Sequence, residues 1–189
     1  MGVFKKEDIQ RYELLDRLFN YADTRFRFLI EWDPSSLFHR INSGWLPLHL
    51  AASESSIRGF RLVFEAGIRY FPNKKGICLL FTTDGYDDTP FQEACGRFGY
   101  EEVMKSVEDT LIRNSDTPIN TTEALIMAAI DENIHLDCVY FLLRRQPDIL
   151  HTLLSSKHAT VTAMTVDSST SKAINNNRDS EKRKRKRGI

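Results

Sequence analysis

Apolar residues recur at helical spacing along much of the chain, and this pattern predicts amphipathic helices. The clearest helix has apolar residues at Ile57, Phe60, Leu62, Val63 and Phe64. We expect it to end at Glu65–Gly67, because glycine commonly follows the last turn of a helix. Further helices are predicted over 101–111 and 138–145. The fold class that follows is all-α.

The helix predicted over 101–111 has one apolar side and one polar side. Its predicted inward residues are Val103, Val107 and Leu111, and its predicted solvent side carries Glu101, Glu102 and Lys105. The segments before this helix and before 138–145 carry start signals. Thr89 can cap a helix whose first residue is Pro90, and Asn120 with Glu123 resembles a capping pair.

The N-terminal segment, about residues 8–38, is predicted to form two further helices that cap the rest. Apolar residues of the first are Tyr12, Leu14, Leu15, Leu18 and Phe19, and those of the second are Phe26, Phe28, Leu29 and Ile30. Asp33–Leu37 would then close this unit and lead into a turn.

The segment 68–86 interrupts the helical pattern. Its apolar run Ile77–Phe81 is too short for a helix and stands between turn-like clusters, which favours an enlarged hairpin finger. Tyr70, Phe71 and Phe81 could serve as binding anchors on this finger. Alternatively, these aromatic residues fold back over the preceding helix, since exposed apolar patches are rare on soluble proteins.

Three segments resemble the ankyrin repeat family. The most specific is Asn42–Ala52, whose Gly, Pro-Leu-His and Ala-Ala occupy the positions of the family's turn and first helix. Thr89–Cys95 with Gly99–Lys105 is similar to a second copy, and Glu123–Ala129 with Cys138–Arg145 is similar to a third. The resemblance spans roughly 12–154 and implies a short α-solenoid of helix-turn-helix repeats.

We therefore divide the chain into an ankyrin repeat domain over 1–154 and a tail over 155–189. The predicted repeats cover about 42–67, 87–111 and 120–145. About three repeats is near the lower limit for a stable array, so the chain could also be part of a larger or partner-stabilised assembly.

The repeats depart from the family's pattern at their turns. Leu46 replaces the usual Thr in the first repeat, Gln92 replaces the usual His in the second, and the third lacks both. His49 keeps the family's position, which implies that its imidazole bonds backbone at the repeat junction. Each lost turn hydrogen bond costs about 0.5–1.5 kcal/mol, so we expect a modestly stable array.

The resemblance also implies where a partner protein binds, because ankyrin proteins usually use the concave face formed by turn tips and first helices. The corresponding residues are Ser43, Trp45, Ser53, Glu54, Tyr86, Asp88, Gly96, Arg97, Asn120 and Thr122, followed by Ile130 and Asp131. Trp45 is the leading candidate because Trp dominates interface hot spots. It could instead pack against Tyr86 or against the 68–86 segment.

Composition adds a basic C-terminal tail. The chain has 26 basic and 26 acidic residues, but a cationic run of Lys182, Arg183, Lys184, Arg185, Lys186 and Arg187 ends a Ser-, Thr- and Asn-rich stretch that is typical of disorder. Such a run suits a nuclear-import receptor, and alternatively it could bind the phosphate backbone of nucleic acid. We expect an intracellular protein, nuclear or cytoplasmic, and a monomer.

Markers of catalysis are sparse. The five histidines and three cysteines lack metal-ligand spacing, and no phosphate loop or nucleophile elbow is present. We expect reduced cysteines in the core, no metal or cofactor, and no enzymatic activity. No apolar run approaches the ~20 residues of a membrane span. The leading hypothesis is a non-catalytic adaptor, and the alternative is a nucleic-acid-associated protein that binds through the tail.

Overall fold

The computed structural model describes residues 4–15, 23–41, 44–72, 75–116 and 119–151. Its contacts divide the chain into two units, residues 1–146 and residues 147–189. Of the second unit only residues 147–151 are described, as a turn followed by the start of a helix. Everything below concerns the first unit.

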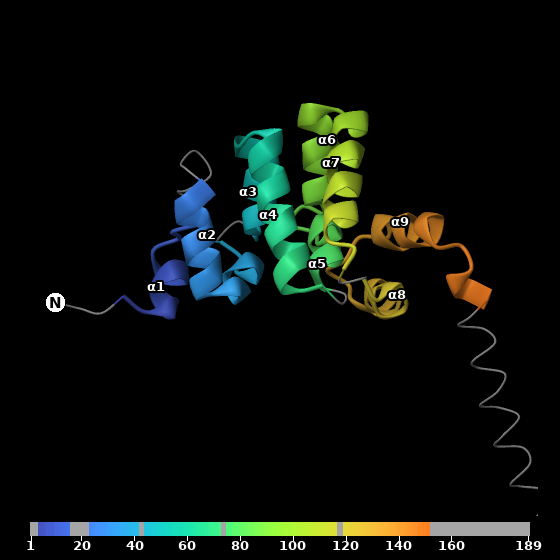
Figure 1. Cartoon of the computed structure of the whole chain (residues 1–189), viewed down its shortest axis with the longest axis horizontal. Helices are drawn as coiled ribbons and strands as arrows, with labels where there is room; N and C mark the ends of the chain where they lie inside the picture. Colours follow the sequence, from blue (N-terminus) through green and yellow to red (C-terminus); the bar gives the residue numbers. More distant parts are fainter. Residues whose placement is uncertain (1–3, 16–22, 42–43, 73–74, 117–118, 152–189) are drawn as a thin grey trace, which may run out of the picture. The chain divides into compact units, whose positions relative to one another are not determined.

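The described part of this unit is all-α, as the apolar pattern predicted (Figure 1). Its elements are α1 (Lys6–Arg11), α2 (Asp23–Trp32), η1 (Pro34–Phe38), α3 (Pro47–Glu54), α4 (Ile57–Tyr70), α5 (Lys75–Cys78), η2 (Leu79–Phe81), α6 (Pro90–Phe98), α7 (Tyr100–Arg113), α8 (Thr121–Ile130) and α9 (Asp137–Arg145). The described residues form no strand, and the single β-bridge among them joins Thr82 to Ile134.

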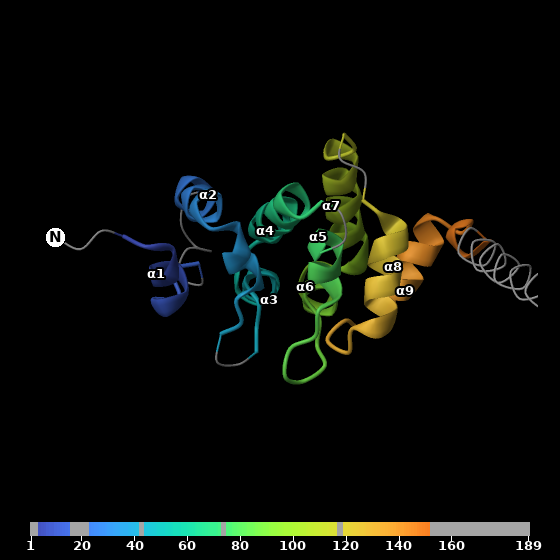
Figure 2. The same cartoon turned by 90° about the horizontal axis from the view of Figure 1, so that it is seen from below.

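The helices associate as antiparallel neighbours in sequence and then pack pair against pair. α3 packs against α4, α6 against α7, and α8 against α9. Between the first two pairs, α3 contacts α6 and α4 contacts α7, an arrangement that can be followed in Figures 1 and 2. On α7, Glu101, Glu102 and Lys105 are exposed and Val103 and Val107 are fully buried, as predicted, but Tyr100 and Ile112 are exposed as well.

The end of α4 differs from its prediction. The helix continues past Gly67 to Tyr70, and Gly67 is buried within it. A Cβ atom at this position would lie only 2.7 Å from Leu79 Cδ1. Gly67 therefore allows close packing of η2 against α4 and does not end the helix.

The predicted finger at 68–86 is wrong in its central part. Ile77–Phe81 forms the end of α5 and the whole of η2, and every residue of the run is at most 2% exposed. The ring of Phe81 lies 5.4 Å from the rings of both Phe91 and Phe141. Phe81 is thus a core residue between two helix pairs. The half-buried Phe71 packs edge-on against Phe38 at 4.8 Å.

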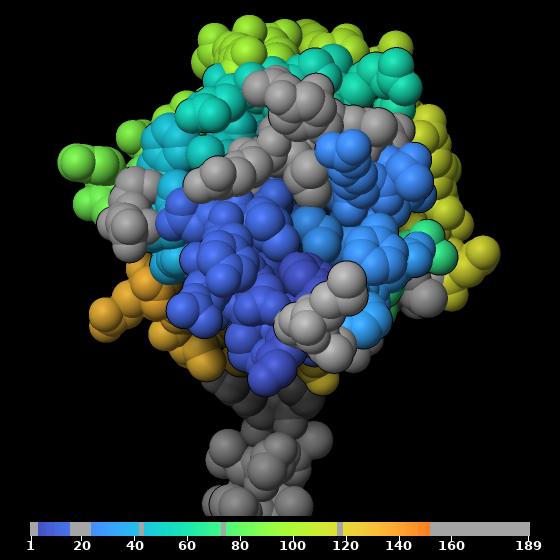
Figure 3. All heavy atoms as spheres, turned by 90° about the vertical axis from the view of Figure 1, so that its left-hand side faces the viewer, coloured from blue at the N-terminus to red at the C-terminus, as the bar shows by residue number. Residues whose placement is uncertain are grey.

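The prediction for the N-terminal cap is wrong about its first helix. The first helix is α1, which ends at Arg11, and Tyr12 to Leu15 follow as turns with Glu13 at φ +48°. Leu18 and Phe19 lie outside the described residues. The second predicted helix is α2, and it buries Phe26, Leu29 and Ile30. Figure 3 looks onto this end of the chain, where α1 and α2 form the middle of the surface.

The predicted helix starts are confirmed. Thr89 Oγ1 accepts a hydrogen bond from the Gln92 N–H at 3.2 Å, and Pro90 is the first residue of α6. Asn120 Oδ1 accepts from the Glu123 N–H at 3.1 Å. The expectation of core cysteines holds for Cys78 and Cys138, whereas Cys95 is only half-buried.

Candidate functional site

Three turn tips lie side by side along one edge of the helix pairs. The first includes residues 40–41 and 44–46, with Gly44 at φ +83°. Arg40 Nη1 donates to the Gly44 carbonyl at 2.7 Å and to the Thr83 carbonyl at 2.8 Å, so one guanidinium joins the first tip to the second. The second tip, residues 82–88, precedes α6.

The third tip, residues 131–136 between α8 and α9, is joined to the second tip by backbone hydrogen bonds. The Thr83 N–H donates to the Asn133 carbonyl at 2.7 Å, and the His135 N–H donates to the Phe81 carbonyl at 2.7 Å. These bonds satisfy loop groups that would otherwise need water. Each tip is therefore hydrogen-bonded to its neighbour.

Trp45 contributes to this connection. Its indole Nε1 donates to Asp84 Oδ2 at 2.8 Å, and its ring stacks on His49 with centroids 6.4 Å apart. Of the alternatives open for Trp45, the structure shows packing against the 68–86 segment, through Asp84. Tyr86, the other possible packing partner, stays 81% exposed.

Asp84 organises the second tip through its carboxylate. Oδ1 accepts from the Tyr86 N–H at 2.7 Å and from the Asp88 N–H at 3.1 Å. Partial burial acts to raise the pKa of Asp84, but these two bonds and the bond from Trp45 outweigh it, so the pKa is lowered.

His49 has the role that the ankyrin resemblance implied. It is fully buried, its Nδ1 accepts from the Leu46 N–H at 3.0 Å, and its Nε2 lies 3.3 Å from the Asp88 carbonyl. Because Nδ1 accepts, Nε2 carries the proton and donates to Asp88. Burial lowers the pKa of His49 to about 4, so the ring is neutral at pH 7.

Gln92 takes the equivalent role in the next helix pair, which corrects the expectation that this turn loses its hydrogen bonds. Its Oε1 accepts from the Thr89 N–H at 3.1 Å, as His49 Nδ1 accepts from Leu46. Its Nε2 donates to Asp137 Oδ2 at 3.3 Å, towards the following pair. An amide carries one acceptor and one donor at its two ends, as neutral imidazole does.

An open groove of about 390 Å³ runs along α6 beside α3. Its lining residues are Ser53, Asp88, Gln92, Glu93, Gly96 and Arg97. Ser53 Oγ donates to Glu93 Oε2 at 2.8 Å across the two helices. The groove thus brings together four residues that the sequence assigned to the partner-binding face, namely Ser53, Asp88, Gly96 and Arg97.

Two groove residues were missed from the sequence. The resemblance to the ankyrin family did not indicate Gln92 or Glu93 as partner-binding residues. The helical period could have found Glu93, because it precedes Gly96 by three residues and Arg97 by four, and such residues share a helix face.

Gly96 is exposed within α6, and a Cβ atom built there would meet nothing within 4 Å. Glycine inside a helix costs about 0.5–1 kcal/mol relative to alanine. No contact among the described residues accounts for this glycine, in contrast to Gly67. The absence of a side chain leaves the floor of the groove open.

The other predicted site residues do not line the groove. Glu54 and Tyr86 are exposed at the end of α3 and on the second tip, Asn120 caps α8, and Thr122 is half-buried. Ile130 is 76% exposed and Asp131 half-buried. Ser43 and the cationic run Lys182–Arg187 lie outside the described residues, so the proposals for import and nucleic-acid binding stay predictions.

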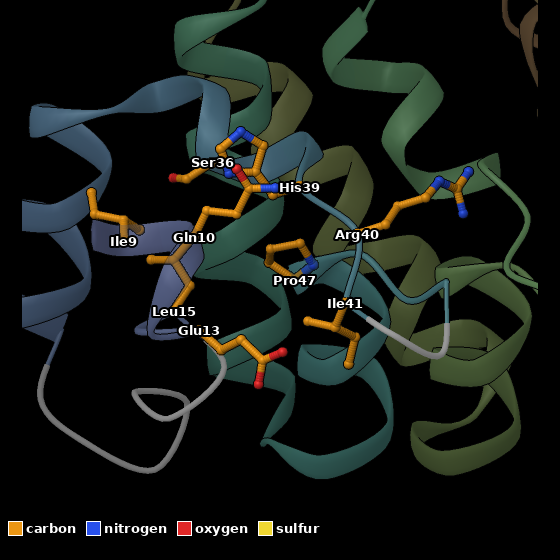
Figure 4. Close-up of a pocket in the computed structure, with 9 residues that line it drawn as sticks. All are labelled: Ile9, Gln10, Glu13, Leu15, Ser36, His39, Arg40, Ile41 and Pro47. Carbon is orange, nitrogen blue, oxygen red and sulfur yellow. The ribbon is translucent and has the colours of Figure 1, made fainter. Parts of the chain in front are cut away.

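A second cavity, of about 200 Å³, lies beside α1 and η1 (Figure 4). Gln10, Glu13 and His39 are among its lining residues, and His39 Nδ1 is buried with no hydrogen-bond partner among the described residues. The sequence did not predict this cavity, because its walls come from a turn after α1 and from η1, which show no periodic pattern.

Within the described ranges, no three His, Cys, Asp or Glu side chains are placed to hold a metal ion. No helix there is long and apolar enough to cross a membrane. Comparison with family models, curated proteins and solved structures gave no match.

Proposed function

We propose that the chain is a non-catalytic interaction module of the ankyrin type, which binds a partner protein along the α3–α6 groove and the adjoining turn tips. The observation that supports this most is the groove itself. It gathers four residues that the repeat resemblance assigns to the binding face, one from α3 and three from α6 and the turn just before it.

The hydrogen bonds between the turn tips favour a binding surface that is already formed before a partner docks. Arg40, Asp84 and the backbone of Thr83 hold the tips through bonds of 2.7–2.8 Å. A surface that is already ordered loses little conformational entropy when a partner docks. Tyr86 projects from this edge, and an exposed tyrosine on a fixed turn is a suitable contact for a partner.

The groove also offers mixed chemistry. Asp88 and Glu93 present carboxylate acceptors, and the exposed Arg97 presents donors at the other end of α6. Gly96 between them allows a partner's backbone to approach the helix closely. This combination suits an extended polypeptide segment.

The test is affinity capture from native lysate with the full chain, followed by mass spectrometry. Gly96→Gln would fill the groove floor while favouring the helix, and Arg97→Glu would reverse its cationic end. Both should lose the partners that the wild type captures. Arg58→Glu, at an exposed position of α4, is the matched control and should keep them. Partners retained by both groove variants would contradict the proposal.

A further inference from the structure

Two of the three cysteines meet in the core. Cys78 is the last residue of α5, and Cys138 is the second residue of α9. Both are at most 2% exposed, and their side chains are hydrogen-bonded to each other. The two thiols are therefore in direct contact, although they come from elements that are far apart in the chain.

The backbone explains why these two thiols meet. The segment after η2 and the segment before α9 run antiparallel through the β-bridge and the hydrogen bonds beside it. The residues that face each other there are Phe81 with His135, Thr82 with Ile134, and Thr83 with Asn133. Continuing this register by three residues, away from the turn tips, leads to Cys78 on one segment and to Cys138 on the other.

Local hydrogen bonds fix both cysteines relative to this bridge. The Cys138 N–H donates to the His135 carbonyl at 3.0 Å, and Thr82 Oγ1 donates to the Cys78 carbonyl at 2.9 Å. Each cysteine thus lies one helical turn from the paired backbone. The contact between the thiols follows from the backbone and does not depend on one side-chain rotamer alone.

This pair has a chemistry that a single buried cysteine lacks. One buried cysteine packs as a small apolar residue. Two thiols that already touch in the folded chain can also be oxidised to a disulfide, because this bond forms only between cysteines whose side chains face each other at short range.

We propose that Cys78 and Cys138 form a redox-modification site, at which a low-molecular-weight disulfide converts the two thiols into an intramolecular disulfide bond. One protein thiolate attacks a sulfur of the small disulfide and expels half of it as a thiolate. The second protein thiolate attacks the protein sulfur of the mixed disulfide and expels the other half. Two electrons pass from the cysteines to the small disulfide, and the two protein protons end on the two small thiols.

The closed core determines when this reaction occurs. The hydrogen bond between the thiols and their burial raise the pKa of Cys138, so the reactive thiolate forms only after the site opens. α8 and α9 contact the earlier elements chiefly through α5 and η2, and Figures 1 and 2 show α5 beside α8. A movement of this last helix pair therefore exposes both cysteines, and the bond then ties α9 to α5 and restricts further opening.

The first test is incubation of the full chain with oxidised glutathione, followed by intact-mass measurement and peptide mapping. The expected product is lighter by two hydrogen atoms and contains one linked peptide pair, Cys78 with Cys138. Urea below the unfolding midpoint should accelerate its formation, because the last helix pair then opens more often. The shortest loop joins Cys78 to Cys95, so that link should dominate only in the fully unfolded chain.

Urea denaturation tests the effect on the fold. The linked chain should unfold at a higher urea concentration than the reduced chain, because a cross-link over a long segment restricts the unfolded state, and a reductant should reverse this shift. Cys95→Ala is the matched control and should give both the link and the shift, whereas Cys78→Ala should give neither. Peptide mapping of Cys95→Ala decides the question even if Cys78→Ala does not fold, since it leaves the site unchanged.

Two results would overturn the proposal. The first is that Cys78 and Cys138 stay reduced, or carry glutathione without a link between them, at every urea concentration below the midpoint. The second is that Cys78 links to Cys95 in the folded chain, which would show that the contact with Cys138 does not direct the oxidation.

Discussion

At the scale of single residues, His49 and Gln92 show how two different side chains can perform one structural task. Both accept from the backbone N–H three residues earlier and reach forward to the next helix pair. The sequence indicated the role of His49 through its motif. The role of Gln92 was missed, although Thr89 and Gln92 have the spacing of a capping box, in which a glutamine accepts from the backbone N–H of the capping residue.

His49 should make stability depend on pH. Its pKa falls from 6.5 in the unfolded chain to about 4 in the folded one, so the unfolded chain binds the extra proton first. The contribution is complete above pH 6.5 and is lost as the pH falls towards 4, by up to about 3 kcal/mol. Urea denaturation between pH 7 and pH 4.5 would measure this loss.

The control for this experiment follows from the second helix pair. His49→Gln introduces the side chain that already works at position 92, so the variant should fold and lose most of the dependence on pH between 6.5 and 4.5. The remaining slope reports other groups whose pKa changes on folding, such as Asp84 and Asp131, whose pKa values are lowered. An identical slope in both proteins would show that His49 is not the responsible group.

At the scale of helices, the surroundings of a glycine decide whether its replacement by alanine raises or lowers stability. Two helical glycines of this chain should respond in opposite directions. Gly96→Ala should stabilise the protein by about 0.5–1 kcal/mol, because alanine favours the helix and meets no neighbour. Gly67→Ala should destabilise it by about 1–3 kcal/mol, because its Cβ would collide with Leu79.

Urea midpoints of the two variants against the wild type provide the measurement. If Gly67→Ala leaves the midpoint unchanged or raises it, the close approach of η2 to α4 is not what requires Gly67.

The segment between α4 and α6, which forms α5 and η2, is where the prediction from the sequence differed most from the structure. Ile77–Phe81 has too few residues to form a stable helix alone, and isolated short helices are marginal in water. Its five residues become helical because α4, α6, α8 and α9 surround them and bury their side chains. Tertiary packing therefore determines the conformation of this segment.

At the scale of the whole molecule, the same packing brings distant cysteines together. Cys78 on α5 and Cys138 on α9 are both buried, and their side chains are hydrogen-bonded, which together with burial raises the pKa of Cys138. Sixty residues separate them in the chain. Their spacing alone indicated no relation.

Thiol labelling should distinguish the three cysteines by their reaction rates. The half-buried Cys95 should react with an aromatic disulfide reagent first, whereas Cys78 and Cys138 should react only as fast as the protein opens, because the reactive thiolate is neither formed nor accessible in the core. Mass spectrometry after timed quenching would assign the sites, and urea should make all three equivalent. Equal rates without urea would contradict the packing around α5.

The sequence by itself determined the helical class, the starts of α6 and α8 and the buried sides of α4 and α7. It also indicated the backbone-bonding role of His49, and four of the residues that line the groove. These features depend on helical periodicity, on caps and on a local motif, all of which act between residues a few positions apart.

The tertiary structure decided the rest. It placed Phe81 in the core and Trp45 against Asp84, extended α4 past Gly67, and completed the turn bonds through Gln92. Each of these outcomes depends on a neighbour about ten to sixty residues away in the chain. Local propensity cannot encode such a neighbour, because the burial and hydrogen bonds that favour the contact exist only after the helix pairs have packed.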